Sequence, residues 1–359
     1  MVNVLTIDLG RDYGGAEKVI ENLFFYNYSD INMHLVALKD TKFFEVIKSK
    51  DKNKNFMFIE NDKKKILKSL FEVKKYIENN NIDIIHAHGV TAEIFGVLLS
   101  KMTKCKLVTT IHSRADFDTI NEIKGKIYCF LQKVLLKYNN KYIVVSDALN
   151  DFFINEMKVD SKKIDTIING IKSLEKRRKN LNDVFTISTI GRLTPVKAHK
   201  KLIDALIELK KENVKFKCVI AGNGELEKEL KEFVNENDMT NEIKFYGFID
   251  DVRDVLDESN CLIIHSDMEG LPITLLETMS YDVPIIAHQI GGIAGVINEK
   301  NGIPMKRNDA NEIKNKIKFC MQNEEEIKLR AKQAEIDFIN KYEISKFINS
   351  YCKLYKSLQ

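Results

Sequence analysis

The sequence predicts an α/β protein of two domains, each built on a parallel β-sheet with helices on both faces. Its 359 residues are enough for two domains of about 150 residues each. Short, continuously apolar runs alternate with longer segments of helical period, which is typical of a doubly wound parallel sheet. A charge-rich stretch without apolar period, residues 172–180, interrupts this alternation, and the alternation then starts again.

The apolar runs and the periodic segments place the elements in order along both halves. In the first half the predicted strands are residues 2–8, 33–38, 83–87, 107–111 and 142–145, and the predicted helices are 16–26, 66–78, 91–102 and 120–136. In the second half the predicted strands are 184–190, 217–221, 243–246, 261–265 and 284–287, and the helices are 202–211, 225–235 and 273–281. Residues 343–358 repeat apolar side chains near i, i+3, i+4 and i+7, so a last helix should cover an apolar surface of one of the domains.

The composition argues against several classes of protein. A hydrophobic share of 44%, a charged share of 30% and a net charge of only +4 disfavour a disordered chain and a nucleic-acid-binding protein. No apolar run reaches the roughly 18 to 20 residues that a bilayer-spanning helix needs. No basic leader precedes the first strand, and the six cysteines are scattered, so we expect a cytoplasmic protein with reduced thiols, either a monomer or a dimer.

The positive charge is concentrated in the first half. Residues 1–175 hold 27 basic and 23 acidic side chains, whereas residues 176–359 hold 29 of each. The segment 124–141 alternates lysines with apolar side chains, and two interpretations of it stay open. It could lie on an anionic membrane surface, or its apolar face could pack on its own sheet.

A loop with two cations follows the first predicted strand of the second half. Gly191 permits a tight turn at the strand end, and Arg192 and Lys197 follow before the next helix. Ligands of doubly wound sheets bind at the carboxyl ends of the strands, and an Arg with a Lys suits a diphosphate. Taken alone, the two side chains could equally be ordinary solvated cations.

A second loop, residues 267–277, combines a helix start with two glutamates. Gly270 frees the backbone, and Pro272 suits the first helical turn. The backbone N–H groups at the helix start, together with the helix dipole, predict an anion site, and they belong to Leu271, Ile273 and Thr274. Glu277, one turn further, could reach a ribose, and Glu269 could face a sugar, although both could simply stabilise the helix dipole.

Two weaker signals follow the next strands of the second half. Gly222 follows a predicted strand, but Glu227 stands where a dinucleotide fingerprint needs its third glycine, which argues against a dehydrogenase. Phe248 follows another strand and could offer an aromatic edge to a base.

The first half holds a glycine loop and two histidine loops. Gly14 and Gly15, followed by Glu17, lie between the first strand and its helix, where they let the backbone approach a ligand. His88 and His112 follow later strands.

A metal site is not expected from these residues. His86 and His88 form a His-x-His pair, but no third ligand is near in the sequence. The Asp-Phe-Asp triplet at residues 116–118 lies outside a strand end.

Taken together, three motifs resemble glycosyltransferase family 4. They are Gly14-Gly15-x-Glu17, Gly191-Arg192-Leu193 with Lys197, and Glu269-Gly270-Leu271-Pro272 leading to Glu277. The resemblance implies a GT-B fold: two Rossmann-like domains that face each other across a cleft, with the C-terminal helix crossing back to the first domain. It implies an acceptor-binding domain over residues 1–172 with 343–359, and a donor-binding domain over 173–342.

The resemblance also implies a role for each matching residue. Arg192 and Lys197 would bind the donor diphosphate, and Glu277 would hold the ribose. Glu269 and His112 would address the transferred sugar and its developing positive charge. The remaining expected contacts to the nucleotide sugar are Gly14, Gly15, Gly191, Gly222, Phe248, Gly270, Leu271, Pro272, Ile273 and Thr274, and those expected on the acceptor side are Glu17, His88 and Arg114.

The implied reaction is retaining transfer of a hexose or N-acetylhexosamine. The donor would be a nucleotide diphosphate sugar, with UDP favoured and GDP possible, and the acceptor a sugar hydroxyl on a lipid carrier, in surface polysaccharide assembly at the inner face of the cell membrane. No cofactor or divalent metal is expected, because protein cations can stabilise the leaving diphosphate. A nucleotide-sugar epimerase and a non-catalytic nucleotide-sugar-binding protein are the alternatives. The chain departs from the family at Ala198, often glycine, and at Gly295, often glutamate.

Overall fold

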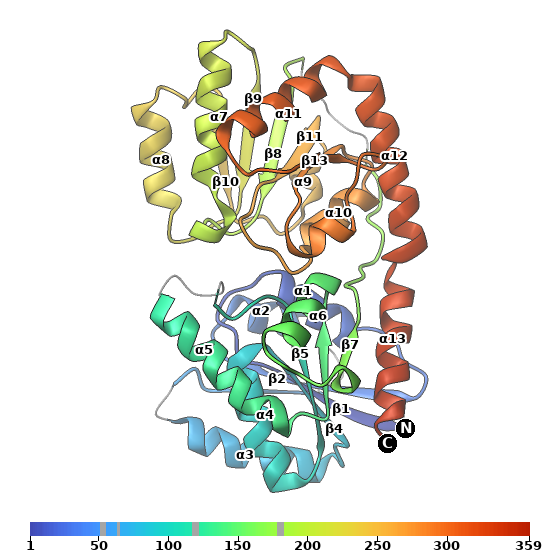
Figure 1. Cartoon of the computed structure of the whole chain (residues 1–359). Helices are drawn as coiled ribbons and strands as arrows, with labels where there is room; N and C mark the ends of the chain where they lie inside the picture. Colours follow the sequence, from blue (N-terminus) through green and yellow to red (C-terminus); the bar gives the residue numbers. More distant parts are fainter. Residues whose placement is uncertain (51–54, 63–64, 117–121, 178–182) are drawn as a thin grey trace. The chain divides into compact units, whose positions relative to one another are not determined.

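The chain consists of two compact units in the computed structural model, which describes residues 1–50, 55–62, 65–116, 122–177 and 183–359 (Figure 1). Unit 1 contains Met1–Gly170 and Ile344–Gln359, and unit 2 contains Ile171–Glu343. The boundaries expected from the sequence lie within two residues of these.

Unit 1 is built on a parallel sheet of seven strands in the order β3-β2-β1-β4-β5-β6-β7. The order reverses between β1 and β4, where Asp8 is the register partner of His88 at the carboxyl end of the two strands. Such a switch point is where doubly wound sheets bind ligands. The strands are β1 (Val2–Asp8), β2 (Ile31–Leu38), β3 (Phe56–Ile59), β4 (Ile84–His88), β5 (Lys106–Ile111), β6 (Lys141–Val144) and β7 (Ile164–Thr166).

Helices cover both faces of this sheet. On one face, α3 and α4 pack on apolar side chains of the central strands, among them Leu5 and Ile85. On the other face, α13 buries Tyr351 and Tyr355, so the last helix belongs to unit 1. The family resemblance implied this placement, which the apolar pattern alone had left open. The helices of unit 1 are α1 (Gly15–Phe24), α2 (Lys42–Lys50), α3 (Ile66–Asn79), α4 (Gly89–Thr103), α5 (Glu122–Leu135), α6 (Asp147–Asn155) and α13 (Ile344–Ser357).

Unit 2 repeats this plan with six parallel strands in the order β10-β9-β8-β11-β12-β13. Its switch point lies between β8 and β11. The two parallel sheets confirm the predicted α/β class. The strands are β8 (Thr186–Ile190), β9 (Lys217–Ala221), β10 (Ile243–Gly247), β11 (Cys261–Ile264), β12 (Ile285–His288) and β13 (Ile303–Met305). The helices are α7 (His199–Lys211), α8 (Glu227–Glu236), α9 (Arg253–Leu256), α10 (Ile273–Ser280), α11 (Ala310–Gln322) and α12 (Glu324–Lys341).

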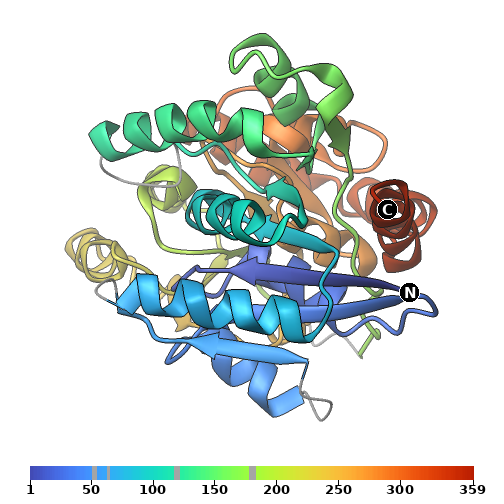
Figure 2. The same ribbon diagram turned by 90° about the horizontal axis from the view of Figure 1, so that it is seen from below.

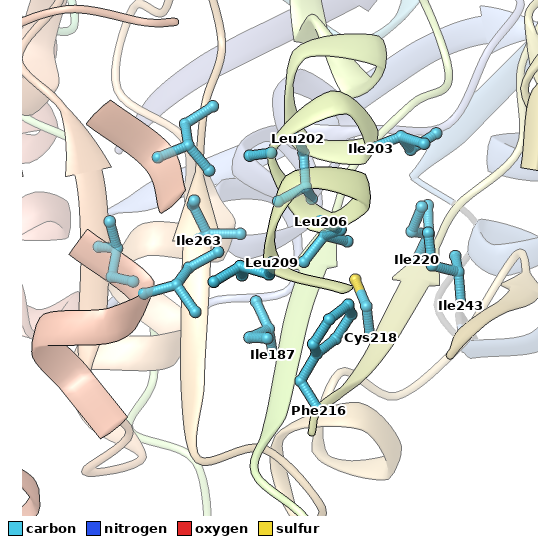
Figure 3. Packing of buried hydrophobic residues seen from close by; sticks show 14 of the residues in the cluster. Ile187, Leu202, Ile203, Leu206, Leu209, Phe216, Cys218, Ile220, Ile243 and Ile263 are labelled. Atoms are coloured by element: carbon cyan, nitrogen blue, oxygen red, sulfur yellow. The ribbon is translucent and has the colours of Figure 1, made fainter. Parts of the chain in front are cut away.

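The core of unit 2 fixes the helix that follows the cationic loop. Leu202, Leu206 and Leu209 of α7 lie against Ile187 and Ile220 of the sheet, and all five are fully buried (Figure 3). Burying each such side chain contributes about 1.5–3 kcal/mol. This packing holds α7, and with it the end of the loop from β8, in one position.

Candidate active site

The loops at the carboxyl ends of β8, β9 and β10 are joined backbone to backbone. Gly191 N donates to Ala221 O at 2.9 Å, and Gly222 N donates to Gly247 O at 2.7 Å. Gly222 has a φ of +132°, and a Cβ on it would lie 1.9 Å from Gly191 O. Only glycine fits this close approach, so Gly222 has a structural reason to be glycine whether or not it contacts a nucleotide.

Lys197 and Glu269 form an ion pair where the loops after β8 and β11 meet. Lys197 Nζ lies 2.5 Å from Glu269 Oε1, and the two side chains are 21% and 10% exposed. The same carboxylate oxygen accepts a hydrogen bond from Ser266 Oγ at 2.6 Å. Asp267 N donates to Val196 O at 2.8 Å, which joins the two loops. The structure thus brings together two residues that the sequence had marked separately.

The loop after β12 contacts the backbone carbonyl of Glu269. Gly291 has a φ of +52°, and a Cβ on it would lie 1.8 Å from Glu269 O. Gly292 N donates to the same carbonyl at 3.3 Å. A Cβ on Gly295, by contrast, would meet no atom within 4 Å among the described residues. Gly291 therefore sets the position of the Glu269 backbone.

The other expected donor residues of unit 2 lie at α10 and on the loops after β8 and β10. Pro272 is the N-cap of α10, which begins at Ile273, so the loop from 270 to 274 forms the predicted helix start. Glu277 lies inside α10 and is buried. Arg192 and Phe248 have exposed side chains on the loops after β8 and β10.

Two buried histidines beside this edge were not singled out from the sequence. The rings of His199 and His265 meet edge to face with centroids 5.1 Å apart, and both residues are 2% exposed. Burial lowers the pKa of His265 to about 4 and that of His199 to about 2, so both are neutral at physiological pH. Their only signal in the sequence is that they directly follow a strand end and the cationic loop.

At the carboxyl edge of unit 1, two carboxyl groups lie beside the glycine loop. A Cβ on Gly10 would lie 2.8 Å from Glu17 Oε1 and 3.3 Å from Asp8 Oδ1. Gly14 N donates to Glu17 Oε2 at 2.7 Å, which holds the start of α1. Burial, with repulsion from Glu17, raises the pKa of Asp8 to about 8, so Asp8 is largely protonated at neutral pH. Glu17 was expected at this edge from the sequence, whereas Asp8 was not.

The expected histidines of unit 1 form one group. His88 Nδ1 and His112 Nε2 are hydrogen-bonded at 2.9 Å, and the two rings are stacked with centroids 5.2 Å apart. His86 lies against His88 at a centroid distance of 4.2 Å. In the part of the chain that the structure describes, no three metal-ligating side chains are grouped so as to hold an ion.

Arg114 is held by partners of its own unit. It forms two hydrogen bonds to the carboxylate of Asp116, at 2.7 and 3.1 Å, and its guanidinium lies 4.1 Å from the centre of the Phe152 ring. The rest of the Asp-Phe-Asp triplet, residues 117 and 118, lies outside the described residues. Arg114 is therefore engaged locally in this structure.

Two family models match the chain, one for each half. The model "Glycosyltransferase Family 4" matches residues 13–173, and the model "Glycosyl transferases group 1" matches residues 159–336. The chain therefore belongs to the glycosyltransferases with two Rossmann-like domains, of the GT-B, family 4 type. Its activity is that of a transferase.

Characterised relatives and solved structures agree with this assignment. The chain is 25% identical to "UDP-Gal:alpha-D-GlcNAc-diphosphoundecaprenol alpha-1,3-galactosyltransferase" of Escherichia coli, in an alignment that covers 81% of this chain and 79% of that protein. It is 27% identical to the capsular polysaccharide biosynthesis glycosyltransferase CapH of Staphylococcus aureus, over 61% of this chain and 63% of CapH. In fold it matches Anabaena HepE, solved with UDP and glucose, with a TM-score of 0.86 at 18% identity, over 99% of this chain and all of HepE.

Proposed function

We propose that this protein is a retaining glycosyltransferase that moves a hexose or N-acetylhexosamine from a UDP-sugar to a hydroxyl of a lipid-linked sugar, in surface polysaccharide assembly. The observation that carries the proposal is the Lys197–Glu269 ion pair at the switch point of unit 2. The activity for which the Escherichia coli relative is named, with its UDP-galactose donor and diphosphoundecaprenol acceptor, supports the substrate classes. GDP in place of UDP is the alternative donor.

The proposed reaction needs positive charge where the diphosphate leaves. The bond between the anomeric carbon and the phosphate oxygen breaks, and its electron pair leaves with the nucleoside diphosphate. The acceptor oxygen bonds to the anomeric carbon on the same face, and its proton passes to a phosphate oxygen. Arg192, Lys197 and the start of α10 stabilise the negative charge as it develops. Glu269 and His112 contact the transferred sugar, and Glu277 holds the ribose.

The ion pair gives this proposal a specific first step. In this structure, the Lys197 ammonium is paired with the Glu269 carboxylate at 2.5 Å. A diphosphate competes with that carboxylate for the ammonium, and Ser266 retains its hydrogen bond to Glu269. Donor binding then leaves Glu269 free to face the electron-poor sugar.

The test is transfer by single variants of the two cations. We expect Arg192→Ala and Lys197→Ala each to lower kcat about 10²- to 10³-fold, as loss of a charge-stabilising group does. Lys201→Ala is the matched control. Lys201 lies in the first turn of α7, is 40% exposed and forms an ion pair with Asp267 at 2.7 Å. A panel of nucleotide sugars, with and without acceptor, identifies the donor. Equal activity in all three variants, or free epimerised sugar nucleotide without acceptor, would contradict the proposal.

A lipid-linked acceptor calls for a membrane-facing surface, and α5 offers one. Ile123, Ile127, Phe130 and Val134 are 70%, 51%, 66% and 45% exposed. Their spacing of four, three and four residues places them within an arc of about 60° on the helix. Packing on its own sheet, the other interpretation left open for segment 124–141, is therefore wrong for Ile127, Phe130 and Val134.

Lysines border the stripe. Lys126, Lys133 and Lys137 are exposed, and Lys101 and Lys137 both lie over the ring of Tyr138, at 3.9 and 5.0 Å. A helix with this pattern suits the interface of an anionic bilayer, where each lysine near the surface contributes about 1 kcal/mol. None of the described helices is long and apolar enough to cross a bilayer.

Two neighbouring helices extend this surface. In unit 1, α4 packs between α3 and α5, so the three helices lie side by side (Figure 2). Exposed apolar side chains occur on both neighbours: Leu67 and Phe71 on α3, and Leu98 on α4. We infer that this layer of unit 1 rests on an anionic membrane.

Vesicle sedimentation tests this inference independently of transfer. We expect binding to vesicles rich in phosphatidylglycerol and little binding to pure phosphatidylcholine. Phe130→Glu should lower partitioning by roughly tenfold or more, because it removes about 1.5–3 kcal/mol of burial. Leu329→Glu, at a side chain 65% exposed on α12 of unit 2, is the control and should have no effect. Absence of binding, or a solution dimer that Phe130→Glu dissociates, would overturn it.

A further inference from the structure

The C-terminal helix places two tyrosine hydroxyls on buried polar groups of the sheet in unit 1. Tyr355 OH lies 2.7 Å from His86 Nδ1, and Tyr351 OH lies 3.1 Å from Thr110 Oγ1. Thr110 Oγ1 in turn lies 2.7 Å from His86 Nε2. All four residues are fully buried. Both ring nitrogens of His86 are therefore engaged, one by a helix and one by the neighbouring strand.

From His86 the group continues to the sheet edge. The His86 and His88 rings are in contact at a centroid distance of 4.2 Å, and His88 Nδ1 is bonded to His112 Nε2 at 2.9 Å. Only His112, the last member, is partly exposed. Tyr355 and His112 are thus the two ends of one continuous set of contacts.

The histidines of this set are neutral at physiological pH. Burial lowers the pKa of His86 to about 3 and that of His112 to about 4, and it lowers the pKa of His88 well below its usual value. A neutral imidazole has one donor and one acceptor nitrogen, and the partner at one nitrogen selects which of them carries the proton. The partner of His86 therefore influences the tautomer and orientation of that ring, and the ring contact passes the orientation on to His88.

We propose that Tyr355 is a positioning residue that acts through His86 and His88 to fix the ring orientation of His112. The proposal rests on the proposed function, in which His112 contacts the transferred sugar. Tyr355 itself touches no substrate. Its hydroxyl keeps His86 in place, and the His88 ring then has one position from which to bond His112.

The test compares two tyrosines that each bond a histidine in unit 1. Tyr355→Phe removes one hydroxyl and keeps the ring. Tyr76→Phe is the matched control, because Tyr76 OH bonds His34 Nδ1 at 2.9 Å and the rings meet edge to face in the same way. Long-range ¹H–¹⁵N NMR of the histidine rings reports the tautomers, and steady-state kinetics with UDP-binding measurements report function.

We expect Tyr355→Phe to shift the ring-nitrogen resonances of His88 and His112 and to lower kcat about 10-fold or more, because a small displacement of a group that contacts the reacting sugar slows transfer. UDP affinity should not change, and Tyr76→Phe should leave the His88 and His112 resonances and kcat as they are. If Tyr355→Phe does not fold, Thr110→Val, which removes the partner at His86 Nε2, is read by the same NMR experiment.

Unchanged His112 resonances in the folded variant, or equal changes in Tyr76→Phe, would overturn the proposal. If the resonances shift but His112→Gln transfers sugar normally, positioning stands and the proposed role of His112 in transfer fails. The two conclusions are therefore separated by one set of samples.

Discussion

The buried carboxyl of Asp8 should make the free energy of unfolding depend on pH. Asp8 is 4% exposed, accepts one hydrogen bond from Gly10 N at 3.2 Å, and has Glu17 as its charged neighbour. Its pKa is raised to about 8 in the folded protein, against 3.8 for the unfolded chain. Between about pH 4 and pH 8, Asp8 therefore carries a proton in the folded state but not in the unfolded state.

The sign follows from this difference in bound protons. The contribution of Asp8 to stability is fully present below pH 4 and is lost as the pH rises toward 8, at about 1.4 kcal/mol per pH unit. Asparagine resembles the protonated acid and does not titrate. The stability of Asp8→Asn relative to the wild type should therefore rise by about 3 kcal/mol between pH 5 and pH 7.

The measurement is urea unfolding at pH 5, 6 and 7, with pulse proteolysis to separate cleavage in unit 1 from cleavage in unit 2. The control is Asp12→Asn, an exposed carboxyl in the same loop, which should change stability by less than about 0.5 kcal/mol at each pH. A difference between Asp8→Asn and wild type that stays constant from pH 5 to pH 7 would refute the reasoning.

Two further predictions concern backbone conformation at the edge of unit 2. In Gly291→Ala the new Cβ would lie 1.8 Å from Glu269 O, so the Glu269 backbone must move and kcat should fall by at least about tenfold. Gly295→Ala should keep wild-type kinetics, because its Cβ meets no described atom within 4 Å. Ala198 has a φ of +56°, a left-handed conformation that costs roughly 1–2 kcal/mol for a residue with a Cβ. Ala198→Gly should therefore raise the free energy of unfolding by about 0.5–1 kcal/mol after the entropy cost of glycine, and denaturant unfolding that shows a loss would contradict this.

The sequence predicted the strands that matter for the sites because those strands are central. A strand covered on both faces is continuously apolar, as in Val2–Asp8 and Lys217–Ala221, whose predicted bounds agree with the structure. The edge strands Phe56–Ile59, Ile164–Thr166 and Ile303–Met305 were not predicted, because three or four residues carry too little pattern.

Individual contacts of the site were beyond sequence reasoning, since they depend on register and loop closure. Lys197 and Glu269 were each marked from their own loops, but their pairing requires β8 and β11 to be neighbours in the sheet. Asp8 looked like an ordinary polar residue at a strand end, and only burial beside Glu17 makes it unusual. Ala198, noted as a departure from the family, coincides with a left-handed position that favours glycine.

Because unit 1 is made of two segments that flank unit 2 in the chain, the order of synthesis has a consequence for folding. While the ribosome is still making unit 2, the sheet of unit 1 exists without Tyr351 and Tyr355, and His86 and Thr110 have no hydroxyl cover from α13. Unit 2 is continuous and can fold as soon as it emerges. Unit 1, which is translated first, therefore completes its fold last. A nascent chain that stalls late would contain a folded unit 2 and a unit 1 whose His86 lacks its hydroxyl partner from α13.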